Sequence, residues 1–144
     1  MSAESFVDTN VLIYAACGAF DYPDKHRRSW EIIGDGNYAV SAQVMAEFYV
    51  NSMSAKKQMI PLKHHEATGW LDRLALAQVV AVSHEIVLQA AVYSQRFQIS
   101  YWDAALISAA ETLDLKILYT EDLNHGQMYG TVTSINPFRL KDED

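Results

Sequence analysis

Short apolar runs alternate with longer segments of helical periodicity along the chain, and this alternation is the strongest constraint on the fold. The longer segments place apolar residues three and four positions apart, which is typical of helices with one buried face. Strands that alternate with helices form a parallel sheet covered on both faces. The sequence therefore predicts an α/β fold, a three-layer sandwich with a mostly parallel central sheet of four to five strands. The strands are expected at 5–7, 38–40, 79–82, 115–119 and 132–135.

The length and composition fit one folded domain over residues 1–144. A chain of 144 residues lies within the usual range for a single domain, and it has no internal repeat and no linker rich in Pro, Gly or Ser. Half of the residues are apolar and 20% are charged, which excludes intrinsic disorder. Cys17 is the only cysteine, so an internal disulfide and the zinc sites built from several cysteines are excluded.

Polar residues predict where four of the helices begin. Thr9 or Asn10 can cap the first helix, Asp24 the second and Ser41 the third. Ser100 is followed three positions later by an acid, which indicates a capping box. The helix after Ser100 is apolar on nearly every face over 104–110, so we expect it to be deeply buried.

The net charge is −7, which argues against nonspecific nucleic-acid binding by a basic surface. It remains compatible with a nucleic-acid enzyme that concentrates acids in its site. The first five residues carry Glu4 and no basic residue, so no secretory signal is expected. The apolar runs are shorter than the roughly 20 residues that span a bilayer. We therefore expect a cytoplasmic protein without a membrane segment.

Acidic residues occur where the predicted strands end. Asp8 directly follows the first strand, and Asp122 comes three residues after the fourth. The carboxyl ends of parallel strands lie at one edge of a sheet, where ligands bind in open α/β folds. Asp103 lies in the first turn of the buried helix and Glu47 lies two turns into the helix after the second strand. Taken singly, each acid can be a cap, a turn residue or an exposed helix former.

Together the four acids indicate a cation site. Two carboxylates about 4 Å apart repel each other by roughly 4 kcal/mol at an effective dielectric constant near 20. A cluster of Asp8, Glu47, Asp103 and Asp122 therefore requires a cation, and oxygen ligands favour Mg²⁺ or Mn²⁺. We expect Asp103 to be the most desolvated of the four, because its helix is apolar on all sides.

Four short motifs contain the four acids: Phe6–Leu12, Ala46–Phe48, Tyr101–Ala105 and Leu118–Leu123. They resemble, in the same order, the motifs of the PIN-domain nucleases. The size of the chain and the segment Asp122–Gln127 most resemble the VapC-type ribonuclease toxins. The resemblance implies a PIN-like version of the fold and a Mg²⁺- or Mn²⁺-dependent endoribonuclease. It carries Asp8, Glu47, Asp103 and Asp122 over as the catalytic, metal-binding acids, with Thr9, Asn10 and Thr120 in supporting positions.

The resemblance also implies an RNA substrate, hydrolysis by metal-activated water, an antitoxin protein as partner and a homodimer. Two alternatives stay open: a PIN-like RNA-processing nuclease that is not a toxin, and a non-catalytic module that binds a metal or a basic peptide. Chelator-sensitive cleavage of structured RNA distinguishes the module from the nucleases.

Two basic segments are candidates for holding RNA phosphates beside the acids. The first contributes Lys25, Arg27 and Arg28, and the second contributes Lys56 and Lys57. The alternative interpretation of both is a solvated helix face.

Overall fold

The computed structural model describes residues 3–139, which fold into a six-stranded sheet covered by helices. Within this range, no helix has the length and apolar character needed to cross a membrane. The helices are α1 (Thr9–Cys17), α2 (Pro23–Ile33), α3 (Ala42–Ser52), α4 (His64–Ala75), α5 (His84–Phe97) and α6 (Tyr101–Thr112). The strands are β1 (Phe6–Val7), β2 (Ala39–Ser41), β3 (Gln78–Val80), β4 (Ile117–Tyr119), β5 (Met128–Tyr129) and β6 (Val132–Ile135).

The strands lie in the order β3-β2-β1-β4-β6-β5. All neighbouring pairs are parallel except the β5–β6 pair, which is antiparallel. The order reverses beside β1, since the chain moves outward through β2 and β3 and then returns to β4 on the other side of β1. A ligand site is expected at the carboxyl ends of the strands beside such a reversal.

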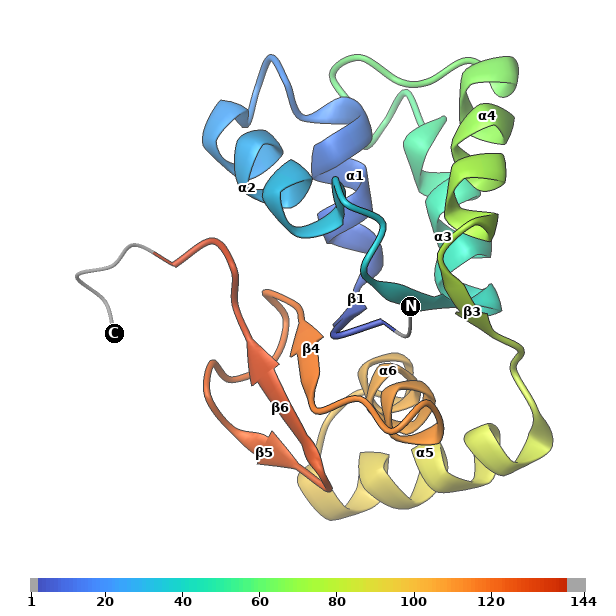
Figure 1. Ribbon diagram of the computed structural model, residues 1–144, viewed down its shortest axis with the longest axis vertical. Helices are drawn as coiled ribbons and strands as arrows, with labels where there is room; N and C mark the ends of the chain where they lie inside the picture. Colours follow the sequence, from blue (N-terminus) through green and yellow to red (C-terminus); the bar gives the residue numbers. More distant parts are fainter. Residues whose placement is uncertain (1–2, 140–144) are drawn as a thin grey trace.

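Helices cover both faces of the sheet, so the fold is the three-layer sandwich that the sequence predicts. In Figure 1, α1 to α4 lie on one side of the strands and α5 and α6 lie on the other. The centre of the sheet is buried: Phe6, Val7 and Leu118 have no exposed surface. The predicted burial of the α6 helix is confirmed, since every residue from Ala104 to Ala110 is buried.

The helix caps confirm two of the predictions and correct two. The Ser41 hydroxyl accepts a hydrogen bond from the Val44 N–H, and Ser100 caps α6 in the same way. Asp24 does not cap α2, because Pro23 occupies the first helical position and Tyr22 precedes it. Proline suits that position, since it has no N–H to leave unpaired. The N-cap of α1 is Asp8, one residue before the predicted Thr9 or Asn10.

The sheet is one strand larger than predicted, because β5 and β6 form a hairpin around Gly130 and Thr131. The Glu111 carboxylate fixes this turn. It accepts hydrogen bonds from the Tyr93 hydroxyl at 2.5 Å and from the Thr131 N–H and hydroxyl at 2.9 and 2.7 Å. Gly130 has φ +61°, and a Cβ there would lie 2.6 Å from the Tyr93 hydroxyl. A strand of two residues with one exposed side chain leaves no clear apolar pattern in the sequence.

We predict that Gly130→Ala destabilises the protein more than Gly36→Ala. Gly36 also has a positive φ, but its added Cβ would meet no atom within 4 Å. The control therefore carries only the backbone strain, about 1–2 kcal/mol. Gly130→Ala should cost about 1–3 kcal/mol more, because it displaces the hydrogen-bonded pair of Tyr93 and Glu111. Urea unfolding of both variants measures the difference, and equal losses would contradict the tight packing at Gly130.

Candidate active site

Asp8 lies at the carboxyl end of β1, buried in the centre of the molecule. Its side chain is only 6% exposed. Its backbone N–H donates to the Tyr119 carbonyl at 3.0 Å, which fixes it to the end of β4. One carboxylate oxygen accepts from the Thr9 N–H at 2.6 Å, and the other accepts from the Thr120 hydroxyl at 2.8 Å. Asp8 thus serves both as the cap of α1 and as an acid fixed at the edge of the sheet.

Burial raises the pKa of Asp8 from its ordinary value of 3.8 to about 7. The hydrogen bond from Thr120 lowers this pKa, the negative charge of Asp122 raises it and the Thr9 N–H lowers it. The net direction is upward because the two donors do not replace the lost water. The site therefore concentrates negative charge without a cation of the protein to balance it.

Thr120 connects Asp8 to Asp122. While its hydroxyl donates to Asp8, the same oxygen accepts the Asp122 backbone N–H at 3.1 Å. Thr120 is completely buried, whereas Asp122 is exposed to solvent. Asn10 lies at the rim, and its amide is 3.5 Å from an Asp122 carboxylate oxygen. One hydroxyl group therefore orders two acids that are far apart in the sequence.

Glu47 reaches the site from α3. Its carboxylate accepts from the Thr9 hydroxyl at 2.9 Å through one oxygen and from the Gln43 side chain at 3.1 Å through the other. Gln43 lies one helical turn before Glu47 and was not among the predicted site residues. The spacing of four residues on a helix is the signal that indicates this contact.

Asp103 lies in the first turn of α6, near two other acids. Burial raises its pKa, the hydrogen bond with the Ser100 side chain lowers it, and the charges of Asp122 and Glu47 raise it. The expectation that Asp103 is the most desolvated acid is wrong, because Asp8 is buried and Asp103 is only half-buried. The apolar part of α6 starts at Ala104, so the carboxylate lies above the core instead of inside it.

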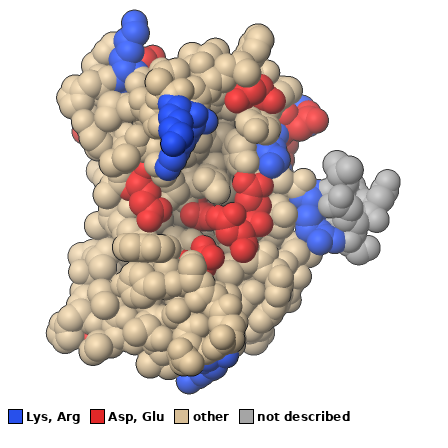
Figure 2. All heavy atoms as spheres, turned by 180° about the vertical axis from the view of Figure 1, so that it is seen from behind, with Lys and Arg blue, Asp and Glu red and all other residues tan. Residues whose placement is uncertain are grey.

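The structure thus brings the four acids and the three supporting residues Thr9, Asn10 and Thr120 to one edge of the sheet. Figure 2 shows Asp and Glu side chains gathered near the centre of one face, with Lys and Arg side chains above and beside them. Hydrogen bonds and charge interactions link these residues in one continuous set. They come from β1 and α1, from α3, from α6 and from the segment after β4.

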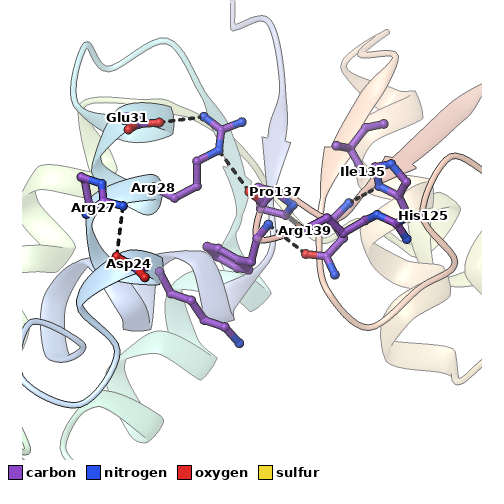
Figure 3. Close-up of a pocket in the computed structure, with 11 residues that line it drawn as sticks. Asp24, Arg27, Arg28, Glu31, His125, Ile135, Pro137 and Arg139 are labelled. Carbon is purple, nitrogen blue, oxygen red and sulfur yellow. Dashed lines mark hydrogen bonds and ion pairs between the residues drawn. The ribbon is translucent and has the colours of Figure 1, made fainter. Parts of the chain in front are cut away.

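A basic pocket of about 540 Å³ lies between α2 and the segment that follows β6. Figure 3 shows Arg28 reaching across it, where its guanidinium donates to the Pro137 carbonyl at 3.1 Å and to Glu31 at 3.2 Å. Arg27 pairs with Asp24 at the exposed side of α2. None of the four acids lines this pocket. Lys56 and Lys57 are exposed on the segment between α3 and α4, away from this pocket.

The third predicted cation of α2, Lys25, has partners that the sequence did not indicate. Its ammonium group donates to Glu121 at 3.0 Å and to the Tyr14 hydroxyl at 3.2 Å. The Tyr14 hydroxyl in turn donates to Glu121 at 2.6 Å. Burial and then the bond to Glu121 raise the pKa of Tyr14 to about 12. Glu121 directly precedes Asp122 in the segment after β4, and no local sequence pattern indicates its contact with Lys25.

The donor chemistry of the site fits a hard divalent cation. All four acids offer oxygen atoms, which Mg²⁺ and Mn²⁺ prefer. Within residues 3–139, none of the four forms an ion pair with a Lys or Arg side chain. No three His, Cys, Asp or Glu side chains of the described range are already close enough to hold one ion together. The four acids therefore share one edge of the sheet without converging on a single point.

Comparisons with known proteins agree with this fold. Residues 5–130 match the sequence profile of the PIN domain. No curated protein sequence matches the chain. A toxin–antitoxin complex from Klebsiella pneumoniae contains a similar chain, with a TM-score of 0.67 at 20% identity, over 94% of this chain and 99% of that one.

Two further solved structures have the same fold. The toxin VapC20 of Mycobacterium tuberculosis, described as cleaving the sarcin–ricin loop, has a TM-score of 0.65 at 18% identity, over 82% of this chain and 89% of its own. VapBC2 of Rickettsia felis, bound to a DNA fragment of its promoter, has a TM-score of 0.61 at 18% identity, over 90% and 96%.

We predict that Asp8→Asn changes the free energy of unfolding of the metal-free protein more favourably at pH 8 than at pH 4. The folded pKa of Asp8 is about 7, above the ordinary 3.8, so ionisation favours the unfolded chain. This cost is absent below pH 4, grows between pH 4 and pH 7 and is complete above pH 7. The amide removes it, so the stability difference between variant and wild type should rise by up to about 4 kcal/mol across this window.

Urea unfolding in chelator at several pH values measures this change. Asp24→Asn is the control, because it removes an exposed carboxylate of α2. A stability difference for Asp8→Asn that stays constant from pH 4 to pH 8 would mean that Asp8 ionises as an exposed acid does.

Proposed function

Because this chain belongs to the PIN domain family, we propose that it is a Mg²⁺- or Mn²⁺-dependent endoribonuclease and the toxin of a toxin–antitoxin pair. The observation that carries the proposal is the set of four carboxylates from four separate segments at the carboxyl edge of the sheet, with no cation of the described chain paired to them. Such an arrangement costs stability in the metal-free protein, and it supplies the oxygen donors of a cation site.

Asp8, Glu47, Asp103 and Asp122 are the residues that would hold the ion. A bound Mg²⁺ or Mn²⁺ supplies Lewis acidity, which activates water and stabilises charge on phosphate oxygens. Thr120 holds the Asp8 carboxylate and the backbone of Asp122, and Thr9 holds Glu47. These two hydroxyls keep the acids in place before substrate arrives, and this preorganisation is what a phosphodiester hydrolysis site needs.

The basic residues of α2 support a nucleic-acid substrate. Arg27 and Arg28 line the pocket of Figure 3, although the chain as a whole has a net charge of −7. An RNA backbone that lies over α2 would place its phosphates near these cations. Lys56 and Lys57, exposed between α3 and α4, are the second proposed contact with phosphates. The description of VapC20 as a toxin that cleaves the sarcin–ricin loop favours RNA over DNA as the substrate.

A toxin requires a partner that blocks it, and we propose an antitoxin protein of the kind present in the complexes from Klebsiella pneumoniae and Rickettsia felis. A PIN-like RNA-processing nuclease that is not a toxin has the same acids and the same metal requirement. Growth arrest on expression, relieved by the antitoxin, distinguishes the toxin from such an enzyme.

We predict that Asp8→Asn lowers the rate of RNA cleavage by more than about 100-fold, since replacing groups that only orient a metal ligand already costs about 10–100-fold. Cleavage of structured RNA by the purified protein in Mg²⁺ or Mn²⁺, with and without chelator, measures the effect. Ca²⁺ should not replace either ion, because it prefers longer bonds and more ligands. The control is Asp72→Asn, which removes an exposed carboxylate of α4 and should cleave like the wild type. Chelator-resistant cleavage, or full activity of the folded Asp8→Asn protein, would sink the proposed function.

The outer face of α5 supports the expected homodimer. Val87, Leu88 and Val92 are 40%, 63% and 46% exposed on this face. Glu85 and Arg96 lie on one flank of it, about three helical turns apart. In an antiparallel pair of α5 helices around a two-fold axis, Glu85 of each copy would lie opposite Arg96 of the other. We therefore propose that a second copy of the chain packs on α5.

We predict that Glu85→Arg converts the dimer to a monomer and that adding Arg96→Glu restores the dimer. The single change places two arginines opposite each other, and the double change exchanges the two charges. Light scattering during gel filtration gives the mass of each variant. A wild-type protein that is monomeric at every concentration, or a dimer that neither change affects, would contradict this interface.

A further inference from the structure

The ammonium group of Lys25 lies where four segments of the chain meet. Lys25 belongs to the first turn of α2, Tyr14 to α1, Glu121 to the segment after β4 and Phe138 to the segment after β6. The ammonium is 3.0 Å from a Glu121 oxygen and 3.2 Å from the Tyr14 hydroxyl. The Tyr14 hydroxyl donates to the other carboxylate oxygen of Glu121, so each of the two oxygens accepts one hydrogen bond. The three groups form a closed triangle of hydrogen bonds.

Three aromatic rings surround the same ammonium group. Its nitrogen lies 4.8 Å from the ring centre of Tyr14, 5.6 Å from that of Tyr22 and 5.4 Å from that of Phe138. The faces of these rings attract a cation. The Lys25 side chain is 34% exposed and that of Glu121 is 20% exposed. Lys25 is therefore held in one position, unlike Arg27, whose ion pair with Asp24 is exposed.

The segment that carries Phe138 is itself fixed to α2. Arg28 donates to the Pro137 carbonyl at 3.1 Å, and Figure 3 shows this bond crossing the pocket. The Phe138 ring also packs edge-on against Tyr14, with ring centres 5.0 Å apart. The Phe138 ring is thus held in place by α1 and α2 without the help of Lys25.

Glu121 links this triangle to the acids of the site. It lies between Thr120 and Asp122, and its side chain points to Lys25 while theirs contribute to the acid set. Thr120 binds Asp8 and Asp122 at once, so a shift of the backbone at Glu121 changes the position of both acids. Glu121 would also add a fifth negative charge next to the site if Lys25 did not neutralise it.

We propose that Lys25 is a positioning residue, which anchors Glu121 and thereby sets the places of Thr120 and Asp122 in the metal site. This inference rests on the proposed function, because it concerns the same acids. Lys25 acts through Glu121 and does not contact the substrate. Its role therefore differs from that of Arg27, which we propose to bind RNA phosphates.

The test uses Lys25→Met, which keeps the length of the side chain and removes its charge. Calorimetric titration with Mn²⁺ alone should show an affinity about tenfold weaker than that of the wild type, the size typical of groups that orient metal ligands. With RNA, kcat should fall and KM should stay within about twofold. Lys25→Arg should restore both, because a guanidinium can also donate to Glu121 and Tyr14.

Three further variants make the test specific. Glu121→Gln should weaken Mn²⁺ binding in the same direction. The double variant Glu121→Gln with Lys25→Met should bind Mn²⁺ no more weakly than the weaker single variant, since both changes act through one link. Arg27→Met changes a cation two residues further along α2, which pairs with Asp24, so it should raise KM and leave Mn²⁺ affinity unchanged.

The outcomes separate this inference from the proposed function. If the wild type binds Mn²⁺ and Lys25→Met binds it equally well, the positioning role is wrong while the nuclease proposal stands. A raised KM with unchanged kcat for Lys25→Met overturns it as well, because that result assigns Lys25 to RNA binding. A wild type that binds no Mn²⁺ overturns both proposals. If Lys25→Met does not fold, Glu121→Gln and Lys25→Arg decide by the same measurements.

Discussion

The hydrogen bond from the Thr120 hydroxyl to the Asp8 carboxylate is the contact on which the rest of the site depends. It joins the ends of β1 and β4, the two central strands, and its donor and acceptor are both buried. Parallel pairing brings these strand ends to one edge, and the strand order reverses beside β1. An acid and a hydroxyl at these two positions therefore meet wherever the chain folds in this way.

Burial gives this contact an electrostatic cost. A carboxylate inside the molecule loses its hydration, and Asp122 adds a second negative charge, so the pKa of Asp8 rises to about 7. Natural chains keep such costly groups mainly where function requires them. The acids reach this edge from separate elements, namely β1, α3, α6 and the segment after β4. A cation would remove most of this cost and draw the acids together.

Around the acids, the chain places its cations selectively. Lys25 neutralises Glu121, which points away from the site, and leaves the site acids unpaired. Arg28 attaches the segment after β6 to α2, and that segment encloses Lys25. Within the described residues, the four acids thus keep their negative potential without a Lys or Arg partner, while the surrounding loops are held by ion pairs and aromatic rings.

The alternation of strands and helices, the two serine caps and the four acids are local features, so the sequence by itself determined the layered fold and the candidate acids. Only the tertiary structure decided how much each acid is desolvated, because this depends on neighbours from other segments. Asp8 is buried beneath α1, whereas Asp103 emerges above the apolar part of α6. The tertiary structure also decides the partners of Lys25, because Glu121 is 96 residues away and no local sequence pattern connects these two residues.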